Sequence, residues 1–162
     1  MQIKNLILEL KVSTINRSPL IFIDQEGGKV QRLRGKNFTD FPPQKIFGDL
    51  CEVNENKALT LSYLTSYLIG NELKEIGIDV NFSPVCDLVF DNAHKIIGNR
   101  SFGKNPETAN KLVSQYCKGL MDSGVFPVLK HYPGHGRSKK DTHNDVSCIR
   151  TDLKTLKETD LI

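Results

Sequence analysis

Short apolar runs alternate along this chain with two long amphipathic segments, and this alternation constrains the fold more than any other feature. The apolar runs lie at about 19–23, 78–82 and 125–129. Runs of this length, bounded by polar residues, are typical of buried strands. Strands that alternate with helices form parallel sheets, because a parallel pair needs a long right-handed crossover between its members. The sequence therefore predicts an α/β fold with about three parallel strands.

The two long segments have the apolar spacing of helices. One extends over about 55–76 and is followed by Gly77, the residue expected at a helix C-cap. The other begins after Asn105, which is expected to cap a helix whose first turn contains a proline, and it should end at Gly124. Asp152 is the expected start of a short last helix.

The composition is that of an ordinary globular domain. The chain has 162 residues and a formal net charge of +3, and 38% of its residues are hydrophobic, which excludes a disordered or low-complexity chain. A charge this small does not indicate nucleic-acid binding. No run approaches the ~20 apolar residues of a membrane span, so we expect no membrane partner. Residues 3–15 fit either a helix or a strand.

The cysteines and the N-terminal residues indicate a cellular location. The chain has four widely spaced cysteines and no Cys-x-x-Cys pair: Cys51, Cys86, Cys117 and Cys148. This pattern is typical of reduced core thiols in a cytosolic protein. The N-terminal residues lack the unbroken apolar stretch of a secretory signal. We therefore expect a cytoplasmic protein.

Polar residues follow each predicted strand. Asp24 comes directly after the first, the stretch 81–87 ends the second, and Lys130 and His131 follow the third. The carboxyl ends of parallel strands converge on one ligand site in α/β folds. We therefore expect these side chains to meet.

The segment from Lys130 onward contains three of the four histidines of the chain within 13 positions. Asp141 lies two residues before His143, where its carboxylate could fix one imidazole tautomer and leave the other nitrogen free for proton transfer. The alternative is a zinc-type site with four ligands: His131, His135, Asp141 and His143. The His-x-x-x-His spacing suits a metal only on a helix, and the neighbouring Pro133 and glycines disfavour a helix here.

Two further clusters are less specific by themselves. Asp24 and Arg32 flank a pair of glycines, which allow a tight turn or close backbone approach, but a plain turn with a surface ion pair explains them equally well. Arg100 stands in a long loop between two glycines, where an exposed arginine is the simpler interpretation.

Together these clusters resemble the β-N-acetylhexosaminidases of glycoside hydrolase family 3, of the bacterial cell-wall recycling type. The matching stretches are 23–32, 82–87, 97–102 and 130–143. They occur in the family's order and cover nearly the whole chain. The last stretch is the most specific, because its Asp-x-His replaces the carboxylic acid that most glycosidases use.

The resemblance implies a TIM-like (β/α)8 barrel that releases terminal N-acetylglucosamine with retention of configuration and without a cofactor or metal. The substrate would be an N-acetylglucosamine-containing saccharide or muropeptide. His143 would be the general acid/base and Asp141 would orient it. Five residues match positions that bind the sugar hydroxyls: Asp24, Arg32, Arg100, Lys130 and His131.

The chain departs from the family pattern at both ends. The family's nucleophile is an aspartate in a later strand-end loop, and neither it nor the first barrel strand has a counterpart here. We expect three or four of the eight β/α units, forming over residues 1–162 a single incomplete family 3 N-terminal catalytic domain. A complementing C-terminal segment would then supply the rest. Two other interpretations stay open at this point, a metal-dependent hydrolase and an inactive sugar-binding remnant.

Overall fold

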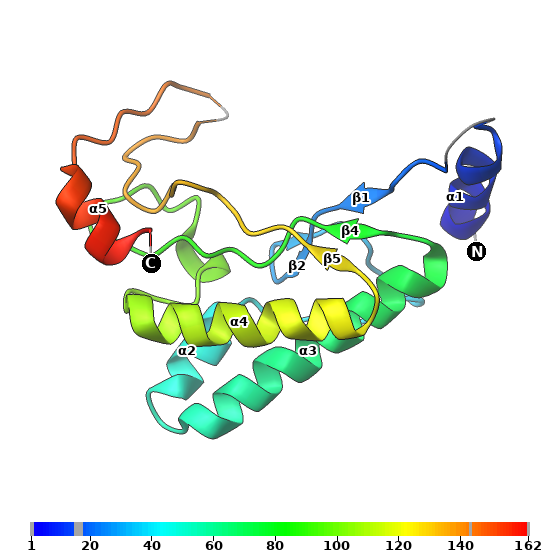
Figure 1. Cartoon of the computed structure of the whole chain (residues 1–162), viewed down its shortest axis with the longest axis horizontal. Helices are drawn as coiled ribbons and strands as arrows, with labels where there is room; N and C mark the ends of the chain where they lie inside the picture. Colours follow the sequence, from blue (N-terminus) through cyan, green and yellow to red (C-terminus); the bar gives the residue numbers. More distant parts are fainter. Residues whose placement is uncertain (1, 15–17, 143, 162) are drawn as a thin grey trace.

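The fold is a small open parallel sheet with helices on one face, seen here in a computed structural model that describes residues 2–14, 18–142 and 144–161. The sheet contains β1 (Phe22–Ile23), β4 (Val80–Asn81) and β5 (Phe126–Pro127), all parallel and in the order β1-β4-β5 (Figure 1). Each strand lies within a predicted apolar run, but only two residues of each run pair as a strand. The predicted parallel α/β fold is confirmed.

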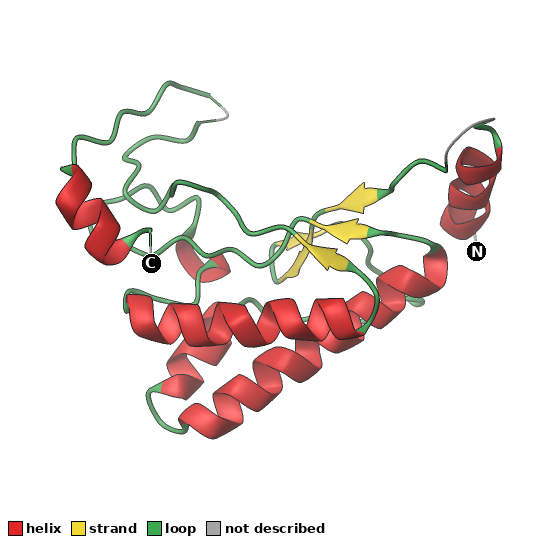
Figure 2. Cartoon of the chain, viewed as in Figure 1, coloured by secondary structure: helices red, strands yellow, loops and turns green. Residues whose placement is uncertain are grey.

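Helices α3 (Glu55–Ile76) and α4 (Pro106–Asp122) connect these strands and lie against the same face of the sheet (Figure 2). Both have the predicted caps. Gly77 ends α3 in the left-handed conformation at φ 94°, which a glycine adopts at little cost. The Asn105 side chain accepts a hydrogen bond from the backbone N–H of Thr108 at the start of α4.

The core lies between these two helices and the sheet. Leu112, Tyr116 and Leu120 of α4 have no exposed surface. The helices pack closely because Gly119 has no side chain: a Cβ there would stand 2.0 Å from Ser66 Oγ and 2.3 Å from the backbone oxygen of Tyr63. This glycine therefore allows the close approach of α3 and α4.

The N-terminal segment, which fits either a helix or a strand by sequence, forms helix α1 (Gln2–Val12). It lies at one end of the molecule (Figure 1) and is attached by Ile7, which is buried, and by an ion pair of 2.7 Å between Lys11 and Asp79. The last helix, α5 (Leu153–Thr159), lies at the other end and begins at Asp152 as predicted. It is held by Arg137, whose Nε donates to Asp160 at 2.8 Å.

One helix and one pair of strands in this part of the chain were not predicted. Helix α2 (Lys45–Cys51) precedes α3, and β2 (Gln25–Gly27) pairs antiparallel with β3 (Val30–Gln31) around the paired glycines. Two buried side-chain amides join these elements to the sheet region. The Asn81 amide exchanges two hydrogen bonds of 2.9 Å with the backbone of Gln25, and the Gln44 amide does the same with Val85 at 2.9 and 3.0 Å.

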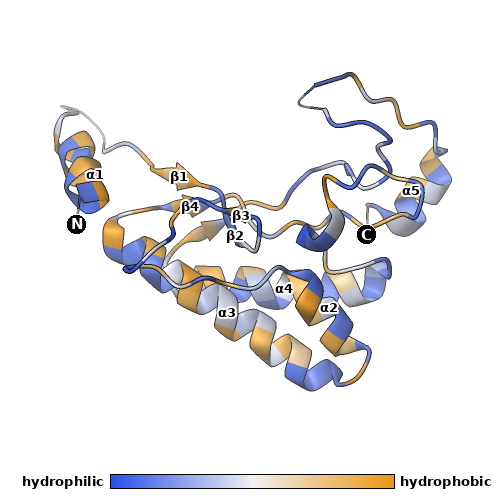
Figure 3. Ribbon diagram, turned by 180° about the vertical axis from the view of Figure 1, so that it is seen from behind, coloured by the Kyte–Doolittle hydropathy of each residue, from blue (hydrophilic) through white to orange (hydrophobic). Residues whose placement is uncertain are grey.

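The other face of the sheet carries exposed apolar side chains. Phe22 and Phe126 are in register on either side of Val80, and they are 48% and 69% exposed. Phe22 also stacks on Phe82 with ring centroids 5.4 Å apart. The hydropathy colouring of Figure 3 shows that strand β1 is made of hydrophobic residues. Among the described helices, none has the length and apolarity that crossing a bilayer requires.

The prediction of four core thiols is wrong in detail. Cys51, Cys86 and Cys117 are half-buried and Cys148 is exposed. Cys148 lies in the irregular segment that leads to α5.

Candidate functional site

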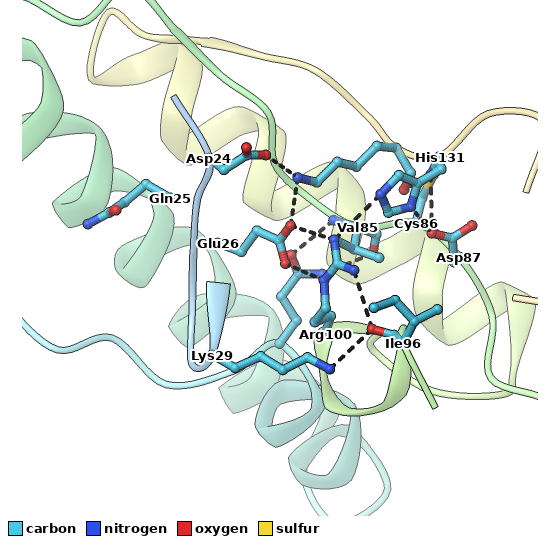
Figure 4. Close-up of polar contacts among 12 residues, drawn as sticks. Asp24, Gln25, Glu26, Lys29, Val85, Cys86, Asp87, Ile96, Arg100 and His131 are labelled. Carbon is cyan, nitrogen blue, oxygen red and sulfur yellow. Dashed lines mark hydrogen bonds and ion pairs between the residues drawn. The ribbon is translucent and has the colours of Figure 1, made fainter. Parts of the chain in front are cut away.

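Four of the predicted site residues meet at the carboxyl end of the sheet. Asp24 and Glu26 are two positions apart after β1, and in an extended chain this spacing places both carboxylates on the same side. Lys130 comes from the end of β5 and is held by a parallel bridge to Val85. Its Nζ lies 2.7 Å from Asp24 Oδ1 and 2.6 Å from Glu26 Oε1 (Figure 4).

Arg100 reaches the same carboxylate from a different loop. It ends the short 3-10 helix η1 (Gly98–Arg100), and its Nε and Nη2 donate to the two oxygens of Glu26 at 2.9 and 2.8 Å. Such two-point contacts between guanidinium and carboxylate are directional as well as strong. Arg100 and Glu26 are 8% and 2% exposed, so this pair is a built part of the interior and not a surface arginine.

The charges in this cluster stabilise one another. Burial alone would raise the pKa of Asp24, but the hydrogen bond and charge of Lys130, with Arg32, outweigh it and lower that pKa. Burial would lower the pKa of Arg100, and its hydrogen bonds to Glu26 more than offset this. Asp24 is therefore an ionised acceptor at neutral pH, and Arg100 and Lys130 are oriented donors.

His131 adjoins this cluster and is held from behind by Asp87. Its Nδ1 lies 2.5 Å from Asp87 Oδ2, and its Nε2 lies 3.5 Å from Arg100 Nη2. The side chain of Asp87 is fully buried, and it also accepts the backbone N–H groups of His131 and His135. Figure 4 shows the imidazole between Asp87 and the Arg100–Glu26 pair.

Arg32 lies at the rim. Its Nη2 stands 3.4 Å from Asp24 Oδ2, and its side chain is 62% exposed. The structure thus brings together Asp24, Arg100, Lys130 and His131 and leaves Arg32 at the solvent side of Asp24.

The Asp-x-His segment is connected to the cluster through His135. The His135 ring packs edge-on to His131, with centroids 5.9 Å apart, and its Nε2 lies 2.9 Å from the hydroxyl of Thr142. Thr142 follows Asp141, whose backbone oxygen accepts the N–H groups of two later residues in a turn. His143 lies outside the described residues, so the Asp141–His143 pair stays a prediction.

Two residues of the site lie in the matching stretches 23–32 and 82–87 but were not predicted to act in it. Glu26 joins Arg100 and Lys130, and Asp87 holds His131. The two-residue spacing of Asp24 and Glu26 was a usable signal for Glu26, whereas nothing local marks Asp87 as the partner of a histidine 44 positions later. Within the described part of the chain, no group of three or more His, Cys, Asp or Glu is arranged to hold a metal ion.

Comparison with known proteins agrees with this geometry. Residues 2–162 match the model of the glycosyl hydrolase family 3 N terminal domain. The chain belongs to glycoside hydrolase family 3. This confirms the resemblance and, with the structural neighbours below, the partial (β/α)8-type fold, of which the structure contains three strand-helix units.

Relatives of this family 3 chain are named for hexosaminidase activity. It is 36% identical over 146 residues to a beta-hexosaminidase of Stenotrophomonas maltophilia, covering 90% of this chain and 43% of the relative. The crystal structure of native NagZ from Neisseria gonorrhoeae superimposes with a TM-score of 0.92 and 35% identity, covering 99% of this chain and 46% of NagZ. NagZ was also crystallised with N-trifluoroacetyl-D-glucosamine, again with a TM-score of 0.92, 35% identity and coverage of 99% and 47%. The chain spans less than half the length of these relatives.

Proposed function

We propose that this family 3 chain carries the sugar-binding half and the acid/base of a retaining β-N-acetylhexosaminidase that releases terminal N-acetylglucosamine. The convergence of Asp24, Arg100 and Lys130 on one strand-end cluster carries this proposal. The hexosaminidase names of the relatives and the N-acyl glucosamine bound by NagZ support the substrate class.

The cluster suits an uncharged sugar. Each sugar hydroxyl both donates and accepts a hydrogen bond, so a site that recognises it needs both kinds of partner. Asp24 offers carboxylate acceptors, and Lys130 and Arg100 offer N–H donors whose directions are set by Glu26. The exposed Arg32 completes the set at the rim.

The reaction would take two steps. His143, oriented by Asp141, protonates the glycosidic oxygen as that bond breaks, while a carboxylate on the opposite face of the sugar forms a glycosyl-enzyme bond. His143 then takes a proton from the water that hydrolyses this intermediate. Because the carboxylate nucleophile of the family lies in a later loop, the completing part of the barrel would supply it.

We propose that this completing part, in the same polypeptide or in a second one, covers the open face of the sheet. Phe22 and Phe126 expose their phenyl rings there, and they precede the cluster residues Asp24 and Lys130 by two and four positions along their strands. A parallel sheet is normally covered on both faces, and the relatives have more than twice the matched length. Strands of the remaining β/α units would bury these rings.

Hydrolysis of a chromogenic β-N-acetylglucosaminide tests the proposed function. The chain is assayed alone and after co-expression with the remaining part of a family 3 relative, and we expect turnover only in the second case. His143→Ala should remove it, whereas His94→Ala should not, because His94 is the one histidine outside the segment 131–143. Equal rates for the wild type and His143→Ala would contradict the assigned acid/base.

We further propose a cytoplasmic role in peptidoglycan recycling. The scattered cysteines of the sequence and the similarity to NagZ support it. Deleting the gene should make N-acetylglucosamine-containing cell-wall fragments accumulate inside the cell. Unchanged levels of these fragments would contradict this role.

A further inference from the structure

The Asp87–His131 contact has a geometry that defines which ring nitrogen of His131 carries the proton. A buried carboxylate accepts hydrogen bonds and donates none, so the nitrogen that faces it must be N–H. Nδ1 of His131 faces Asp87 Oδ2 at 2.5 Å. This contact alone places the proton on Nδ1.

The other side of the ring supports the same assignment. Nε2 of His131 faces Arg100 Nη2 at 3.5 Å, and a guanidinium presents only donors. A proton on Nε2 would set two N–H groups against each other, while a bare Nε2 accepts. Arg100 cannot turn away, because both oxygens of Glu26 hold it.

Asp87 is itself immobilised. It has no exposed side-chain surface, and the backbone N–H groups of His131 and His135 donate to its two oxygens. The carboxylate is thereby directed at the imidazole and cannot rotate away from it. In metal sites and catalytic triads, a carboxylate that fixes an imidazole in this way sets its tautomer and its orientation, and replacing the carboxylate lowers affinity or activity strongly.

We propose that Asp87 is a positioning residue: it holds His131 in the Nδ1–H tautomer, so that the lone pair of Nε2, which makes only the long 3.5 Å contact with Arg100, can accept a hydrogen bond from a sugar hydroxyl in place of that contact. The inference rests on the proposed function for its ligand, a saccharide hydroxyl. It gives the chain a second Asp–His pair, separate from Asp141 and His143, that serves binding and not proton transfer. The neighbouring Arg100 and Lys130 can only donate hydrogen bonds, so His131 would add an acceptor to this part of the site.

The substitution Asp87→Asn tests this assignment. The asparagine keeps the shape, and its amide oxygen in the place of Oδ1 can still accept the His135 N–H. Its N–H₂ in the place of Oδ2 donates to Nδ1, drives the proton to Nε2 and leaves the His131 backbone N–H without this acceptor. Nitrogen-15 NMR of the imidazole reports the tautomer directly and needs no substrate. The matched control is Asp91→Asn, which removes the same charge from an exposed aspartate of the same loop that pairs with Lys104.

We expect wild type and Asp91→Asn to show a protonated Nδ1 and a bare Nε2 on His131, and Asp87→Asn to show the reverse. The Kd of the chain for N-acetylglucosamine should rise about tenfold in Asp87→Asn, and so should the KM of the co-expressed form for the N-acetylglucosaminide, with kcat less affected. A bare Nδ1 in the wild type would overturn the proposal without any variant. A reversed tautomer with unchanged sugar affinity would also overturn it. If the wild type neither binds nor hydrolyses the sugar, the proposed function fails, and the tautomer alone then decides the role of Asp87.

Discussion

Removing the charge of Glu26 should destabilise this fold strongly. Its carboxylate is 2% exposed and pairs with Arg100 at 2.8 Å and Lys130 at 2.6 Å, whose side chains are only 9% and 13% exposed. Glu26→Gln keeps the volume but leaves two buried cations without their shared charge. Breaking a buried pair in this way costs about 3–5 kcal/mol. That is a large part of the ~5–15 kcal/mol that stabilises a typical domain.

Urea unfolding followed by far-ultraviolet circular dichroism measures this loss. With a slope near 2 kcal/mol per molar urea, the midpoint should fall by about 2 M. The control is Glu55→Gln, which removes an ion pair with Lys111 whose two side chains are about half exposed. Such a surface pair contributes at most about 1 kcal/mol. Equal midpoint shifts for the two variants would refute the idea that burial makes the Glu26 cluster costly to break.

Three further predictions concern packing, pH and thiol chemistry. Gly119→Ala should lower the free energy of unfolding by about 1–3 kcal/mol, because the new methyl group meets the α3 backbone and a buried hydroxyl. The control is Ser114→Ala on the exposed side of α4, which should change this free energy by no more than about 0.5 kcal/mol in the same urea unfolding assay. Burial opposes the ionisation of Asp24, but ion pairing with the neighbouring lysine and arginine lowers its pKa below 3.8. The stabilising contribution of Asp24 should therefore be complete above about pH 4 and disappear as the pH falls through the lowered pKa. The free energy of unfolding of wild type and Asp24→Asn, measured against pH, tests this. Parallel curves for the two proteins would contradict it. Burial raises the pKa of Cys117 to about 11, so at pH 8 a thiol reagent should label the exposed Cys148 first and Cys117 far more slowly, as peptide mass spectrometry can measure.

Most of the helical structure was predictable because its signals are local. Helices α3 and α4 have regular apolar spacing, and asparagine and glycine mark their ends with capping chemistry that depends on neighbours only a few residues away. The strands were located but predicted too long. Each predicted strand is an apolar run of about five residues, but only two residues of each run form hydrogen-bonded pairs with a neighbouring strand.

What was missed depends on contacts between distant residues. Helix α2 is short and its N-cap residue, Gln44, makes no capping bond; its amide binds Val85 instead. Arg100 looked like a surface residue because the carboxylate that buries it comes from position 26. The meeting of Asp24, Lys130 and Arg100 was predicted only through the general rule that strand ends converge, and that rule does not say which partner each charge has.

The balance of charge in the cluster has a consequence for how a ligand arrives. Three carboxylates, Asp24, Glu26 and Asp87, stand among three cations, Arg32, Arg100 and Lys130, each within contact distance of an opposite charge or an imidazole. Their fields cancel a short way into solvent, so the site exerts little long-range pull on any molecule. A sugar would meet it by unguided diffusion, and the rate of encounter should be nearly the same in dilute buffer and in strong salt.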